Sequence, residues 1–193
     1  MNAVVPEDLV HRHRLTVEEY YRMAEVGLLA PDARVELIEG EIIDMAPMGN
    51  RHAGVLSQLA ELMATALVEH AHVRVQNPLR LDGLSEPQPD LVLLKRSPDH
   101  YKRAHPMAAD ALLVVEVSES SLRFDMRRKL PLYARHGIPE VWIIDVAAPR
   151  IHFFHSPHET GFAYASSTPQ PGPVRLQALP EGAVDLTGLL DDL

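Results

Sequence analysis

The sequence predicts an α/β protein with one domain, in which helices pack against a mixed central β-sheet. Two runs without a polar residue, 112–115 and 141–144, are typical of strands buried on both faces. Segments with apolar residues at helical spacing stand before and between these strands, as in α/β proteins. The chain has 193 residues, which is enough for one domain with a full core and short for two, so a single domain over 1–193 is expected.

The helices are predicted from residue spacing and from end signals. The first, over 16–25, begins at Thr16 and has Glu19 three residues later, the spacing of a capping box. The second, over 51–68, is long and amphipathic, with apolar residues at 55, 56, 59, 62, 63, 66 and 67. The third, over 125–136, ends at Gly137 and Pro139, and Pro131 inside it predicts either a kink or a later start.

The strands are predicted from apolar runs and turn residues. The segments VELI and EIIDM, joined at Glu39-Gly40, predict an N-terminal β-hairpin over 35–45. Further strands are expected at 73–81, 90–94, 112–117 and 141–146, with an edge hairpin of 151–154 and 162–165. The stretch 166–173, rich in Pro, Ser and Gly, is expected to be a loop, and 176–190 is apolar enough to pack back on the core.

Composition excludes several classes of protein. The chain has no cysteine, which rules out disulfides, thiolate catalysis, iron–sulfur clusters and cysteine-based zinc sites. No apolar stretch approaches the roughly 20 residues of a membrane span, and the N-terminal MNAVVPEDLVHRHRL lacks a signal-peptide core. We therefore expect a cytoplasmic protein with no membrane partner. The net charge of −9 argues against non-specific coating of nucleic acid, but active-site carboxylates contribute to it, so a nucleic-acid enzyme stays open.

Two acidic residues stand where buried strands should be apolar. Glu116 interrupts an apolar run just before Val117, and Asp90 opens a strand directly after the segment PQP. If these strands are neighbours, both carboxylates reach one point, where they repel each other unless one is protonated or a cation lies between them. Mg²⁺ suits two carboxylates with water and a backbone carbonyl, and the carbonyl of Val117 is placed for that role.

A lysine can complete this site from the helix that follows. At helical spacing, Asp125, Lys129 and Tyr133 lie on one face. If that helix packs on the strand ending near Glu116, Lys129 projects toward the carboxylates. Two acids, a metal and a lysine can hydrolyse a phosphodiester, because the metal polarises the phosphate and activates a water, while the ammonium orients that water or offsets charge.

The order of these motifs resembles that of one family. They are ELIEG from Glu36, PD ending at Asp90, EVS from Glu116, and KLPLYARHGIPEVW from Lys129. Over about 15–154 the chain resembles the Uma2 family (DUF820), bacterial proteins of the PD-(D/E)XK restriction-endonuclease-like superfamily. The resemblance implies a restriction-endonuclease-like core with a C-terminal extension at 155–193, and cleavage of DNA that depends on Mg²⁺ or Mn²⁺. The superfamily lysine stands two residues after the acid, where this chain has Ser118, and the resemblance implies that Lys129 replaces it.

Each candidate residue also has a structural explanation. Asp90 could be a strand-start carboxylate held by backbone amides, and Glu116 could pair with an arginine such as Arg127. Glu36 matches the family's hairpin acid and could be a third metal ligand, could hold Lys129, or could be an exposed strand residue.

Two further residues and two functions stay open. Tyr133 is as consistent with core packing as with catalysis, and His52 could face the site, cap its helix or lie on the surface. The first function is a metal-dependent DNA endonuclease that works as a symmetric homodimer, one site per strand. The second is a nuclease fold used as a binding or dimerisation module with weak or no turnover. The complete carboxylate and lysine set favours the first, whereas net acidity and the lack of a separate DNA-binding domain favour the second.

Overall fold

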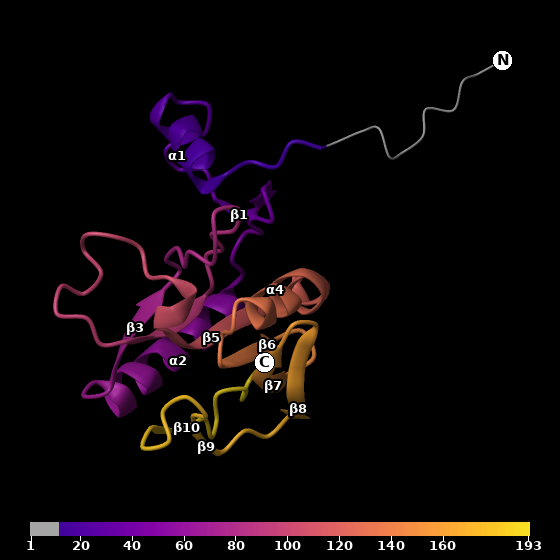
Figure 1. Ribbon diagram of the computed structural model, residues 1–193. Helices are drawn as coiled ribbons and strands as arrows, with labels where there is room; N and C mark the ends of the chain where they lie inside the picture. The colour runs from indigo at the N-terminus through magenta and orange to yellow at the C-terminus, as the bar shows by residue number, and fades with distance from the viewer. Residues whose placement is uncertain (1–11) are drawn as a thin grey trace.

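A six-stranded mixed sheet forms the centre of the computed structural model, which describes residues 12–193 (Figure 1). Its strands follow the order β3-β4-β5-β6-β7-β8. Strands β5 and β6 are parallel, and the other neighbours are antiparallel. The predicted α/β class with a mixed sheet is confirmed. The strands are β3 (Ala71–Val75), β4 (Leu91–Lys95), β5 (Ala111–Ser118), β6 (Glu140–Asp145), β7 (Arg150–His158) and β8 (Gly161–Thr168).

The sheet is covered by helices on both faces. Every residue of β5 and of β6 is buried, and successive side chains alternate between two separate apolar clusters, as Val114 and Val115 do. Helix α2 (Asn50–Leu67) packs in the first cluster, together with β9 (Pro173–Arg175) and β10 (Ala183–Asp185) from the C-terminal part. Helix α4 (Leu130–Arg135) packs in the second, and Figure 1 shows α2 and α4 on opposite sides of the strands.

The N-terminal part adds a small two-stranded sheet. Helix α1 (Val17–Glu25) begins at the predicted capping box, in which the backbone N–H of Glu19 donates to the Thr16 hydroxyl and the Glu19 carboxylate accepts from the Thr16 N–H. The expected hairpin is present as β1 (Val35–Ile38) and β2 (Glu41–Asp44). Leu37 forms a β-bridge with Glu86, which fixes the hairpin against the loop that leads into β4.

The helix after β5 does not begin later than residue 125, which was one of the two expectations for Pro131. It begins earlier, as α3 (Leu122–Phe124), continues through a π-helical turn, η3 (Asp125–Lys129), and only then becomes α4. Pro131 has no N–H, and in a regular α-helix its ring would collide with the carbonyl of Arg127. The π-turn avoids this, since the Leu130 N–H donates to the Asp125 carbonyl five residues back.

Three predicted boundaries also differ from the structure. The strand expected over 73–81 ends at Val75, because Gln76 takes a left-handed backbone conformation with φ of 51°. Strand β8 continues to Thr168, into the segment expected to be a loop, and β7 continues to His158, beyond the strand expected over 151–154. A short 3₁₀-helix, η2 (Ala108–Asp110), precedes β5. Within residues 12–193, no helix combines the length and apolar character needed to cross a membrane.

Candidate active site

The predicted acids and lysine line one cavity of about 270 Å³. Leu91 pairs with Val115 across the antiparallel β4–β5 ladder, so that Asp90 and Glu116 follow at adjacent positions where this ladder ends. Glu36 enters from β1, and Asp125 and Lys129 enter from η3. All five of these side chains are buried, and the structure therefore brings together the groups that the sequence singled out.

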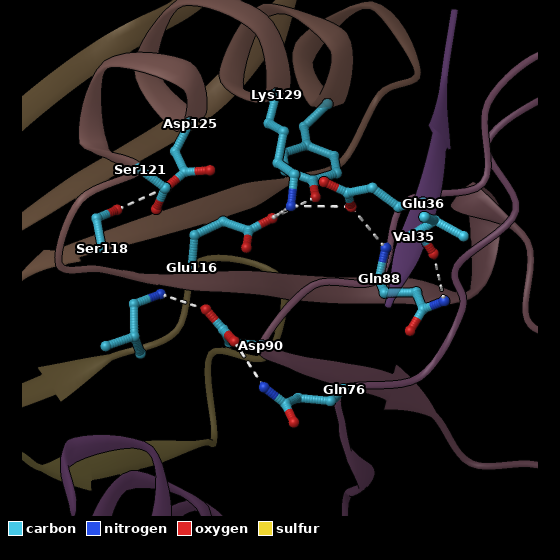
Figure 2. Close-up of polar contacts among 12 residues, drawn as sticks. Val35, Glu36, Gln76, Gln88, Asp90, Glu116, Ser118, Ser121, Asp125 and Lys129 are labelled. Carbon is cyan, nitrogen blue, oxygen red and sulfur yellow. Dashed lines mark hydrogen bonds and ion pairs between the residues drawn. The ribbon is translucent and has the colours of Figure 1, made fainter. Parts of the chain in front are cut away.

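Lys129 lies between two carboxylates (Figure 2). Its Nζ is 3.0 Å from Glu36 Oε2 and 3.2 Å from Glu116 Oε1. Burial by itself would lower the pKa of Lys129, but the charges of Glu116, Glu36 and Asp125 outweigh it and raise the pKa above the ordinary value for lysine. Lys129 is therefore a charged ammonium, and it is the one buried Lys or Arg in the described part of the chain.

Glu116 has one oxygen engaged and one free for another partner. Within residues 12–193 its ion pair and hydrogen bond both use Oε1, which accepts from the Tyr133 hydroxyl at 2.5 Å and lies against Lys129. Oε2 faces away from Lys129, toward the side of the cavity where Asp90 lies (Figure 2). Burial raises the pKa of Glu116 well above its ordinary value; Lys129 opposes this rise, and Asp125, Asp90 and Glu36 reinforce it. The pairing with Arg127 that was left open does not occur here.

Asp90 is held by three donors. Oδ1 lies 2.9 Å from His52 Nε2 and accepts from the Gln76 side-chain amide at 3.2 Å, while Oδ2 accepts from the Val117 N–H at 2.8 Å. Burial raises the pKa of Asp90, but the contacts with His52, Val117 and Gln76 together lower it below the ordinary value. His52 thus faces the cavity, and one backbone amide does hold Asp90, as the structural explanation allowed.

Gln76 is the contact that sequence reasoning missed. Its backbone N–H donates to the Asp90 carbonyl at 2.9 Å and its side chain donates to the Asp90 carboxylate, so it binds the same residue twice. It does so in a left-handed conformation that costs a non-glycine residue free energy. Asn77 and Pro78, which are turn-forming residues, were the available signal that the strand ends here.

Glu36 contacts Lys129 directly, whereas Asp125 holds the start of the π-turn that carries Lys129. Glu36 is buried, so it is not an exposed strand residue, and its Oε2 accepts from the Gln88 N–H at 3.0 Å as well as pairing with Lys129. Asp125 Oδ2 accepts from the hydroxyls of Ser118 and Ser121, at 2.7 and 2.6 Å (Figure 2). Ser118 occupies the superfamily lysine position, and here it anchors the first residue of the π-turn that ends at Lys129.

Comparison with known proteins places this site in a family. The Uma2 family model, described as "Putative restriction endonuclease", matches residues 17–187. The chain belongs to the Uma2 family. The family named from the sequence motifs is thus confirmed, and the match continues beyond residue 154. None of the curated proteins compared matches this chain.

A solved structure shares the Uma2 chain's fold. It is the crystal structure of "a putative nuclease belonging to DUF820" from Anabaena variabilis ATCC 29413, with a TM-score of 0.71 and 15% sequence identity. The superposition covers 91% of this chain and 97% of that one. At this identity the likeness shows the fold, and the predicted restriction-endonuclease-like architecture is confirmed. The family description supports a nuclease function in general terms.

The polar groups of this Uma2 site include ligands that a divalent ion could bind. Among residues 12–193, no group of three or more His, Asp or Glu side chains is arranged to hold a metal by itself. Mg²⁺ needs fewer protein ligands, since it is often bound by one or two carboxylates and keeps several waters. The Val117 N–H faces Asp90, and the carbonyl of a strand residue points to the same side as its N–H. The β4–β5 ladder ends at Leu91 and Val115, so no residue of β4 pairs with Val117, and its carbonyl is available to an ion.

Proposed function

We propose that this protein is an endonuclease that hydrolyses phosphodiester bonds of DNA with Mg²⁺, for which Mn²⁺ can substitute. The observation that carries the proposal is the charge of the cavity: Glu36, Asp90, Glu116 and Asp125 are buried around a single buried lysine. An excess of buried negative charge is costly unless a cation or a proton neutralises it. A divalent ion supplies the missing charge, and the family description agrees with the resulting chemistry.

Three groups would hold the ion. They are the carboxylate of Asp90, Oε2 of Glu116 and the carbonyl of Val117, with water in the remaining positions. When bound, the ion would polarise the scissile phosphate and lower the pKa of a bound water. The Tyr133 hydroxyl and Lys129 keep Oε1 of Glu116 occupied, which directs Oε2 into the cavity.

Lys129 acts as a charged donor and not as the base. An ammonium has three N–H donors, of which Glu36 and Glu116 accept two, so the third is left for a water or a phosphate oxygen. Because its pKa is raised, Lys129 keeps its proton and stabilises negative charge as it develops on the phosphate. Glu36 is a positioning residue, since it holds Lys129. The water oxygen would then bond to phosphorus and give up one proton to solvent, the bond to the leaving oxygen would break, and that oxygen would take up a proton from solvent.

We also propose that the protein works as a symmetric homodimer. A single small domain carries one site, and a two-fold pair of sites would let each strand of a DNA enter one site.

Cleavage of plasmid DNA tests the proposal. The wild-type protein should nick supercoiled plasmid with Mg²⁺ or Mn²⁺ and lose this activity in a chelator. Asp90→Asn and Lys129→Met should each lose about 10²-fold or more of the rate. Glu140→Gln is the matched control, because Glu140 is a buried acid on β6 that does not line the cavity. No cleavage with either metal would favour the binding-module alternative, and full activity in Asp90→Asn would overturn the assignment of the site.

A further inference from the structure

We propose that this site accepts a nucleic-acid strand through one unpaired nucleotide, in single-stranded DNA or in a locally opened duplex, and not as an intact double helix. The proposal rests on the proposed nuclease function and concerns the form of the substrate. It follows from the depth of the acids, the lining of the cavity and the contact between two loops that border it.

The acids lie too deep for a duplex resting on the surface. The exposed fraction is 7% for Asp90 and 2% for Glu116, so a scissile phosphate must enter the cavity to reach them. The cavity volume of about 270 Å³ is just below that of typical ligand pockets, which span roughly 300–1,000 Å³. That space suits one nucleotide, whereas a paired nucleotide would have to bring its partner and its stacked neighbours.

The lining suits a base and a sugar better than a row of phosphates. Seven apolar side chains line the cavity: Ile43, Met45, Ala46, Pro47 and Met48 from β2 and the loop after it, Val117 from β5, and Phe124 from α3. Phe124 is the one Phe, Tyr or Trp ring in this lining among the described residues, and it is half-buried. Aromatic rings stack on unpaired bases of any sequence. Surfaces that grip a duplex instead present Lys and Arg to its phosphates.

The charge at the mouth also favours a single strand. Arg34 is the one basic residue besides Lys129 in the described lining, whereas Asp44 and Glu119 add to the acids inside. A duplex brings two rows of phosphates toward this negative surface, while a single strand brings one.

Two loops that border the cavity contact each other. A Cβ atom placed on Gly49, just before α2, would lie 2.2 Å from Glu119 Oε2, in the loop after β5. Both loops border the cavity, and their contact at a residue without a side chain closes the gap between them at this point.

Cleavage of three labelled substrates of one sequence tests the proposal: a single strand, a fully paired duplex, and a duplex with a central run of mismatches. With Mg²⁺, the single strand and the mismatched region should be cut about tenfold faster than the paired duplex or more, since stacking on Phe124 is available only to an unpaired base. Equal cleavage of the paired duplex would overturn this inference and leave the proposed function intact.

The absence of any cleavage would count against the proposed function. The preference for a single strand would then be tested by comparing the binding affinities of single-stranded and paired DNA. Fluorescence anisotropy in metal-free buffer should show tighter binding of the single strand. Equal or tighter binding of the paired duplex would contradict the proposal.

A matched pair of variants tests the stacking residue. Phe124→Leu keeps an apolar side chain in the core cluster and removes the ring, and it should weaken binding of the single strand by about tenfold. Tyr164→Leu removes an exposed ring on β8, outside the cavity, and should leave binding unchanged. Thermal melting checks that both variants fold. If a folded Phe124→Leu protein binds the single strand with unchanged affinity, no base stacks on the Phe124 ring.

Discussion

Glu116 both holds this site together through its contacts and adds to its excess of buried negative charge. Lys129 and Tyr133 satisfy one of its oxygens, and burial together with the neighbouring acids raises its pKa. Without a metal, burial and the neighbouring acids favour the protonated form of this carboxyl group, and Lys129 favours the carboxylate. A bound divalent ion would replace that proton, so the arrangement is poised to exchange one positive charge for another.

Stability in metal-free buffer should depend on pH through Glu116. Because its pKa in the folded protein lies above the ordinary 4.5, the folded chain keeps a proton that the unfolded chain releases. Stability should therefore fall as pH rises above about 4.5, until Glu116 itself ionises. Glu116→Gln cannot lose a proton, so its melting temperature should rise relative to wild type over this window. Parallel melting curves of the two proteins across pH would contradict the raised pKa.

Gln76 tests whether Asp90 must be held in place. Gln76→Gly relieves the left-handed backbone but removes the amide that binds the Asp90 carboxylate. Thermal stability should change little, because strain relief offsets the lost hydrogen bond, while Mg²⁺ affinity measured by calorimetry should fall about 10–100-fold. Ser156→Gly is the control, since Ser156 has φ of 60° on β7 away from the cavity. Ser156→Gly should raise the melting temperature and leave Mg²⁺ affinity unchanged. An unchanged Mg²⁺ affinity in Gln76→Gly would show that Gln76 does not position Asp90.

At the scale of elements, the π-turn places Lys129. Asp125 is anchored to Ser118 and Ser121 at the start of η3, and Lys129 reaches Glu36 and Glu116 at its end. A regular α-helix would rotate one of these ends away from its partners, because each residue turns the helix by about 100°. The wider turn lets both ends keep their contacts, and π-turns are often found at functional sites.

Replacing Pro131 tests this role. Pro131→Ala restores an N–H and removes the collision that favours the π-turn, so the segment should become α-helical. Thermal stability should be equal or higher, whereas metal-dependent cleavage should fall about tenfold or more, since Lys129 moves relative to Glu116. Pro169→Ala, in the exposed segment after β8, should change neither. Full cleavage activity in a Pro131→Ala protein would show that the π-turn does not position the lysine.

The sequence predicted those elements whose signal is local. Helix α2, the first hairpin and strands β4, β5 and β6 follow from apolar periodicity, and the acids at Asp90 and Glu116 were visible as interruptions of it. The motif order predicted the family and placed Lys129 beside the acids. The π-turn and the left-handed Gln76 were not predictable, because each is a backbone conformation maintained by contacts with distant residues, such as Ser118 and Asp90. The contact of His52 with Asp90 also depends on how α2 packs against the sheet.

At the scale of the whole molecule, net charge and small size determine how the site can be used. A chain with a net charge of −9 and acids at the cavity mouth repels nucleic acid over long distances, and divalent ions screen that repulsion. Divalent ions should therefore strengthen substrate binding in two ways, by occupying the site and by screening the negative charge of the surface.

The proposed dimer is tested by sedimentation. A homodimer should sediment at twice the mass of the 21.5 kDa chain at micromolar concentration, with or without metal. A monomer under the conditions of cleavage would contradict the dimer. One active site per monomer would then agree with cleavage of a single strand.

Calorimetric titration of Mg²⁺ into wild-type, Glu116→Gln and Glu140→Gln proteins, with melting curves in chelator, tests the central claim most directly. If Glu116 is a metal ligand, wild type and Glu140→Gln should bind the ion alike and Glu116→Gln should not. Glu116→Gln should also melt at or above the wild-type temperature without metal, because Lys129 keeps Glu36 as a partner. If Glu116 instead serves only as an ion-pair partner, the same change should cost roughly 3–5 kcal/mol of stability. A Glu116→Gln protein that melts far below wild type and still binds Mg²⁺ with full affinity would contradict the account.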